Sequence, residues 1–98
     1  MGTKPRYRPK NLGRKLFQIR NTLGLSQSQM VRCLGADESF SPARISEYEL
    51  GIREPSLWIL LAYGRAARVH LETIIDDDLT LPEKIPSTFD YRQAKRKA

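Results

Sequence analysis

Four residues near the middle of the chain carry side chains that could read the edge of a nucleotide base. They lie at the start or on the outward side of a short helix expected over residues 42–50: Pro42, Ala43, Arg44 and Glu47. The Arg44 guanidinium could donate two hydrogen bonds to guanine, the Glu47 carboxylate could accept one from cytosine, and Ala43 could touch a thymine methyl group. One good bidentate contact discriminates between bases by about 1–3 kcal/mol. The alternative for Arg44 is a phosphate contact that reads no base.

A second kind of contact is expected where the preceding helix begins. Ser26-Gln27-Ser28-Gln29 has the Ser-x-x-Gln form of a capping box, which opens a helix. The first backbone N–H groups of a helix lack intrahelical partners and attract phosphate, so Gln27 is a candidate phosphate contact. Two short helices joined by a brief turn, the second with a polar outward face, have the sequence form of a helix-turn-helix, which reads the DNA major groove.

Catalytic, metal and cofactor chemistry lack a suitable set of residues. The single cysteine and single histidine, Cys33 and His70, cannot assemble a zinc site. Cys33 could act as a redox switch, although a lone thiol is more often inert. The run 76–78 (DDD) lacks the ligand spacing of a metal loop and fits a solvated linker or an internal partner for basic tails. We therefore expect no enzyme activity, no cofactor and no metal.

The elements around these candidates are predicted to be five short helices and no strand, an all-α fold. Leu12, Leu16, Ile19 and Leu23 recur at helical spacing, and Gly24 can end that helix in the left-handed conformation. Ser26 and Gly35 bound the second helix, and Ser41 and Gly51 the third.

The last two helices are predicted from a cap and an apolar stripe. Ser56 caps the fourth helix, and one side of it is expected to be lined by Leu57, Leu60, Leu61 and Gly64. After a break at residues 68–69, residues 71–75 form a short fifth helix, with His70 expected at its N-cap.

The charge of the chain is concentrated at its two ends. The 98 residues have a net charge of +6, yet residues 11–90 hold nine basic and eleven acidic side chains. Four basic residues and no acid lie in residues 1–10, and the same holds for the last eight residues. We expect a basic N-terminal arm over 1–10, a folded domain over 11–76 and an acidic-then-basic extended tail over 77–98. Such tails suit binding to phosphate backbones, or they only solubilise the chain.

Several motifs resemble the helix-turn-helix domains of phage repressors and Cro, also called the xenobiotic-response-element type. The segments concerned are LGRKLFQIRNTLGLSQSQMVRCLG, ISEYELGIREPS and LLAYGRAARVHLETII, which together span residues 12–75. Each motif alone is weak, but their order and spacing agree. The resemblance implies a compact five-helix repressor-like domain that binds double-stranded DNA.

The resemblance also assigns roles to particular side chains. It implies an ion pair between Arg20 and Glu49 that fixes the third helix to the scaffold, the alternative being an ordinary exposed pair. It implies phosphate contacts from Gln27 and from Arg53, for which a solvated loop charge is the alternative. The phosphate candidates are Gln27, Ser41, Ser46 and Arg53, with Lys15 and Arg14 as weaker ones.

Members of this family dimerise through the region of the fourth helix, which here contains Trp58, Ile59 and Ala62. Trp58 and Ala62 are four residues apart and form an apolar strip beside the inward stripe. A twofold dimer would place two recognition helices about 34 Å apart on a near-palindromic site. The alternative is that Trp58 covers the core of the monomer.

This chain departs from the family pattern by an insertion at residues 36–40. The insertion either lengthens the turn, leaving Phe40 to pack where relatives have a small apolar residue, or tilts the third helix and changes its base contacts. We expect Arg44→Ala to relax base preference and Arg53→Ala to weaken binding to all sequences alike.

The leading hypothesis is a cytoplasmic, sequence-specific DNA-binding transcriptional regulator of bacterial or phage type, a homodimer that represses by occluding a promoter. No segment has the length or composition to span a membrane. The alternative is a protein-interaction module, an antitoxin or a transcription bridging factor, whose residues 79–98 bind a protein partner.

Overall fold

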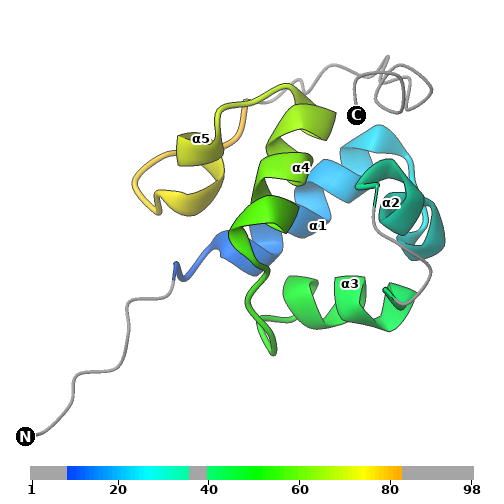
Figure 1. The fold of residues 1–98 in the computed structure, drawn as a ribbon. Helices are drawn as coiled ribbons and strands as arrows, with labels where there is room; N and C mark the ends of the chain where they lie inside the picture. The colour runs from blue at the N-terminus through cyan, green and yellow to red at the C-terminus, as the bar shows by residue number, and fades with distance from the viewer. Residues whose placement is uncertain (1–8, 36–39, 83–98) are drawn as a thin grey trace, which may run out of the picture.

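The computed structural model describes residues 9–35 and 40–82, and in these ranges it is all-α. Five helices follow one another without a strand: α1 (Leu12–Leu23), α2 (Gln27–Cys33), α3 (Pro42–Glu49), α4 (Leu57–Ala67) and α5 (Leu71–Ile75). Figure 1 shows α1 and α4 crossing near the centre, with α5 to one side and α2 and α3 to the other. The predicted all-α five-helix fold is confirmed. Residues 1–8 of the arm, 36–39 of the insertion and 83–98 of the tail lie outside the described residues.

The helix boundaries follow from capping residues. Gly24, with φ 71°, ends α1 in the left-handed conformation, and Gly51, with φ 78°, follows the C-cap of α3. At the start of α2, Ser26 accepts from the Gln29 amide while the Gln29 side chain accepts from the Ser26 amide, so the capping box is complete. Ser41 caps α3 in the same way through the Ala43 amide.

Every helix contributes to one apolar core. The largest fully buried side chains are Leu16 and Ile19 from α1, Met30 from α2, Ile45 from α3, Tyr63 from α4 and Ile74 from α5. α1 lies at the centre of the packing, because it contacts α3, α4 and α5. A core shared in this way fixes the position of α3, whose eight residues would not form a stable helix alone.

The inward side of α4 differs from the predicted stripe. Leu60 and Gly64 are buried as expected, but Leu57 is 73% exposed and Leu61 is only half-buried. The buried positions also include Tyr63 and Ala67. Leu57 lies in the first turn of α4, beyond the edge of the core, so its apolar side chain meets solvent. The prediction that Leu57 faces inward is wrong.

Two glycines allow close approaches that a side chain would block. A Cβ at Gly13, in the first turn of α1, would lie 2.6 Å from the Glu49 carbonyl oxygen and 2.9 Å from that of Tyr48. The N-terminal turn of α1 therefore rests directly on the C-terminal end of α3. A Cβ at Gly64 would lie 3.1 Å from the Val69 carbonyl oxygen, so the chain after α4 packs back onto the helix.

Polar contacts join the two ends of the folded domain. The Asp77 carboxylate accepts from the backbone amides of Lys10 and Asn11, at 2.8 and 3.0 Å. Asp77 thereby serves as a partner for the start of α1, which Asn11 does not cap with its own side chain. His70 occupies the N-cap position of α5 as predicted, but its side chain makes no capping hydrogen bond.

None of the helices in the described ranges is long and apolar enough to cross a lipid bilayer.

Candidate nucleic-acid interface

The polar side of α3 is the part of the domain that could meet a nucleic acid. α3 packs against both α1 and α2, and its inward residues Ile45 and Tyr48 are buried. Pro42 and Ala43, in the first turn of α3, are exposed, and Arg44 and Glu47 are half-buried. All four predicted base contacts are therefore at least partly accessible.

Arg44 is held on an aromatic surface that the sequence reasoning did not assign. Its guanidinium carbon lies 5.2 Å from the centre of the Phe40 ring, a distance typical of a cation–π contact. The Phe40 ring in turn packs against Tyr48, with centroids 6.1 Å apart. Phe40 and Arg44 are four residues apart in the sequence, and this spacing is the feature from which their contact could have been predicted. Phe40 therefore packs against the core and also supports a candidate base contact.

Tyr48 connects this aromatic surface to the charges of α3. Burial raises the pKa of its hydroxyl, and the charges of Arg44 and Arg53 oppose that rise while Glu47 adds to it. All three charged side chains thus influence the hydroxyl group of one buried residue of α3. The local field there is mixed in sign, with two cations and one anion.

Glu47 and Arg53 form an ion pair, although they were predicted to contact different parts of DNA. The Arg53 Nε donates to the Glu47 Oε1 at 3.0 Å, and the two side chains are 53% and 38% exposed respectively. A pair so open to solvent contributes about 0–1 kcal/mol to stability. The pair instead matters for the position of the Glu47 carboxylate, which is a candidate base contact.

Other predicted phosphate contacts have different surroundings. Gln27 is half-buried in the first turn of α2, next to the capping box. Ser41 is exposed and its hydroxyl already accepts from the Ala43 amide, while Ser46 is half-buried on α3. Gln27 and Ser41 therefore lie at the N-termini of α2 and α3, where backbone dipoles favour an anion.

Lys15 is not placed to contact phosphate. Its side chain is buried, with 5% of the residue exposed, and its ammonium donates to the carbonyls of Thr73 and Asp76, both at 2.8 Å. These carbonyls lie at the C-terminal end of α5, where a positive charge is favoured. The prediction that Lys15 binds phosphate is wrong, because the aliphatic part of the side chain crosses the core to reach α5.

The predicted pair of Arg20 and Glu49 is present and bidentate. Arg20 Nε and its terminal nitrogen donate to the two Glu49 oxygens at 2.6 and 3.0 Å, and the side chains are 16% and 8% exposed. Arg20 also donates to the Leu25 carbonyl at the turn before α2. The hydrogen bond with Glu49 raises the pKa of Arg20, and burial opposes it. One guanidinium thus links α1, the turn and the end of α3.

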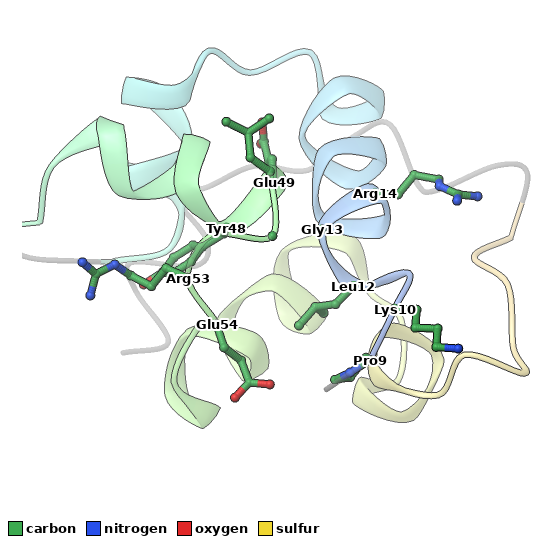
Figure 2. A pocket seen from close by; sticks show the side chains of 11 residues that line it. Pro9, Lys10, Leu12, Gly13, Arg14, Tyr48, Glu49, Arg53 and Glu54 are labelled. Carbon is green, nitrogen blue, oxygen red and sulfur yellow. The ribbon is translucent and has the colours of Figure 1, made fainter. Parts of the chain in front are cut away.

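A groove of about 320 Å³ lies where the start of α1 meets the end of α3 and the loop after it. Its lining includes the basic residues Lys10, Arg14 and Arg53 and the acidic residues Glu49 and Glu54. In Figure 2 the Arg14 and Arg53 side chains project away on opposite sides. They do not converge on a single point, so the groove has no arrangement for chelating one anion.

The predicted dimer residues fall into two groups. Trp58 is 79% exposed, so the alternative that it covers the monomer core is wrong. Ile59 and Ala62 are half-buried and pack against the core. Three other large apolar side chains between residues 50 and 58 are also exposed: Leu50, Ile52 and Leu57.

Cys33 is unsuited to a redox switch. The thiol is buried, and burial raises its pKa to about 12. The reactive thiolate is therefore scarce at neutral pH. No group of three or more His, Cys, Asp or Glu side chains that could hold a metal ion occurs among the described residues.

Comparisons with known proteins found no relative. A scan against protein-family models gave no match, and searches of curated proteins and of solved structures gave none either. The likeness to the repressor and Cro family therefore rests on the sequence motifs and stays a prediction.

Proposed function

We propose that this protein is a sequence-specific double-stranded DNA-binding regulator of transcription whose helix α3 enters the major groove. The chief support is the attachment of α3 to α1 by an ion pair at its C-terminal end. The bidentate Arg20–Glu49 pair fixes its buried end to α1, while Arg44 and Glu47 remain accessible on the other side. A rigid helix with accessible polar side chains is what direct base reading requires.

The N-termini of α2 and α3 supply the complementary contacts to the backbone. Gln27 and Ser41 lie there. Phosphate contacts of this kind set the orientation of a protein on the duplex, whereas base contacts set its preference. The basic ends of the chain, which lie outside the described residues, would add affinity that does not depend on sequence.

A homodimer that represses by occluding a promoter, in the cytoplasm, is the form of regulator we propose. Trp58 supports a dimer contact, because a large aromatic side chain that is 79% exposed gains much by being covered. Two copies related by a twofold axis would read a near-palindromic site.

The test is selection of bound duplexes from a random-sequence library at roughly physiological salt, where non-specific binding is weak. The full chain is expected to enrich a short inverted repeat, and Arg44→Ala to broaden the preference at one position in each half-site. Arg65→Ala is the matched control, since Arg65 is an exposed arginine on α4. Recovery of DNA without a common motif would contradict the proposal.

A protein-interaction module, such as an antitoxin or a transcription bridging factor, is the second candidate. One observation favours it: Leu50, Ile52, Leu57 and Trp58 are each at least 67% exposed, and such apolar side chains suit a protein partner. The tail beyond residue 78 would supply further contacts. Absence of a DNA motif, together with a stable complex with a second protein encoded beside this chain, would favour this function over the first.

A further inference from the structure

We propose that Arg53 sets the base preference of α3 by positioning Glu47, instead of acting as an independent phosphate contact. This inference rests on the proposed DNA-binding function and deepens it. The sequence pattern places Arg53 in a loop, where an arginine is expected to bind the DNA backbone. The structure instead directs its Nε to the Glu47 Oε1 at 3.0 Å.

The backbone makes the same connection. The Glu47 carbonyl accepts from the amides of Ile52 and Arg53, at 2.9 and 3.3 Å, and Gly51 takes the left-handed conformation that this return requires. The loop after α3 therefore folds back onto the turn that carries Glu47. The backbone thus places Arg53 within reach of the Glu47 carboxylate before DNA binds.

The pairing with Arg53 would allow the Glu47 carboxylate to approach DNA. An unpaired Glu47 would be repelled by phosphates and free to sample several rotamers. Arg53 neutralises that charge and holds one oxygen, which leaves the other oxygen as an acceptor for an exocyclic amino group of a base. The side chains are 38% and 53% exposed, so both remain accessible to a duplex.

Arg44 receives comparable support from a different source. It lies on the Phe40 ring, one helical turn before Glu47 on α3. Each of the two charged candidate base contacts thus has a partner outside α3, Phe40 for Arg44 and Arg53 for Glu47. Such pre-organisation reduces the conformational entropy lost on binding and sharpens discrimination. Arg53 therefore belongs to the residues that determine specificity.

The experiment compares the full-length wild type with Arg53→Ala, Glu47→Ala and the double variant. Each is used to select from a random-sequence duplex library, and affinities are then measured on the wild-type site and on its single-base substitutions. Arg53→Ala and Glu47→Ala are expected to lose about tenfold discrimination at the same base pair. The double variant is expected to lose no more discrimination there than Glu47→Ala alone. Arg65→Ala, which removes an exposed charge on α4, is expected to keep the wild-type preference.

A role in phosphate binding gives a different set of results. Arg53→Ala would then keep the wild-type motif, lose affinity equally on all sequences and reduce the log–log salt slope by about 0.9. The losses of Arg53→Ala and Glu47→Ala would also multiply in the double variant. Those results overturn the positioning role. If the wild type itself enriches no motif, the proposed function fails and this inference fails with it. Unchanged thermal melting of each variant confirms that the fold is retained.

Discussion

The Arg20–Glu49 pair joins two helices through side chains that are almost entirely removed from water. Its two hydrogen bonds are 2.6 and 3.0 Å long, and a third from Arg20 to the Leu25 carbonyl satisfies the guanidinium further. Loss of one partner leaves the other charge buried without compensation, which is far more destabilising than loss of a surface pair. The Arg53–Glu47 pair has the same two side-chain types but is exposed to solvent, so it is a comparison for the Arg20–Glu49 pair.

Glu49→Ala is therefore expected to lower the free energy of unfolding by about 3 kcal/mol, and Arg20→Ala by a similar amount. The double variant should lose less than the sum of the two, because it leaves no unpaired charge. Urea unfolding of the four proteins in a double-mutant cycle measures this coupling. The same cycle on Glu47 and Arg53 is the control and is expected to give about 0–1 kcal/mol. Equal coupling in the two cycles would mean that the buried pair behaves as a surface pair.

Tyr63 presents the opposite case, a buried polar group without a partner in the described part of the chain. Its side chain, on α4, is fully buried, and its hydroxyl oxygen has no hydrogen-bond partner among the described residues. Burial raises the pKa of this hydroxyl well above its ordinary value, so it is uncharged at neutral pH. A buried donor left unsatisfied costs about 1–3 kcal/mol.

We expect Tyr63→Phe to leave the stability unchanged or to raise it by about 1 kcal/mol, since the substitution removes only the unsatisfied hydroxyl. Thermal and urea unfolding measure the change. Tyr48→Phe serves as the comparison and is expected to be the less favourable substitution, because the Tyr48 hydroxyl interacts with Arg44. A clear loss of stability in Tyr63→Phe would show that the hydroxyl has a partner, such as a buried water.

At the scale of the helices, the sequence predicted the boundaries well because they depend on neighbouring residues. The Ser26–Gln29 capping box, the Gly24 termination and the Ser41-Pro42 opening are local signals, and all are present in the structure. The Arg20–Glu49 pair was predicted only through resemblance. The inward side of α4 and the contacts of Lys15 could not be predicted, since both depend on which distant element packs against them. Leu57 is exposed to solvent, whereas the Lys15 ammonium binds a carbonyl of α5.

The contact of α1 with α3 supplies a sharp test of helix packing. Gly13 has no side chain where a Cβ would lie 2.6 Å from the Glu49 carbonyl oxygen, which belongs to backbone and cannot rotate away. Gly→Ala inside an exposed helix normally stabilises by about 1 kcal/mol. Here the steric conflict outweighs that gain, because α3 must move to accommodate the methyl group.

Gly13→Ala is expected to lower the free energy of unfolding by about 1–3 kcal/mol, the usual cost of overpacking. Circular dichroism monitored against urea measures the loss. Asn21→Ala, at an exposed position of the same helix, is the matched control and is expected to be neutral or slightly stabilising. If the two variants are equally stable, α1 and α3 do not approach as closely as the backbone positions indicate.

At the scale of the whole molecule, the two ends of the domain are joined on one side of the fold. Asp77 binds the backbone at Lys10 and Asn11, and Lys15 binds the carbonyls that end α5. These Asp77 contacts are to backbone amides, and the predicted pairing of the acidic run with the basic tails falls mostly outside the described residues. The point at which the N-terminal arm leaves the domain is thereby fixed relative to α1.

The exposed Trp58 is the feature that most directly bears on assembly. A tryptophan that is 79% exposed next to Leu57, itself 73% exposed, presents apolar area that a second copy could bury. Because Trp58 makes little contact within its own chain, replacing it should change folding stability by no more than about 0.5 kcal/mol. Its effect on association can therefore be measured separately from its effect on the fold.

We expect the full chain to be a dimer at micromolar concentration and Trp58→Ala to raise the dimer dissociation constant by at least about 30-fold, the effect of losing an aromatic anchor. Sedimentation velocity over a range of concentrations measures both constants. Phe17→Ala is the control, because it also removes an exposed aromatic ring, 46% exposed on α1, and is expected to leave the dimer intact. Weakened association should also reduce binding to an inverted repeat far more than binding to a single half-site, since each half-site contact is unchanged. A wild-type chain that remains monomeric throughout the range would contradict the dimer and leave Trp58 available to a different protein partner.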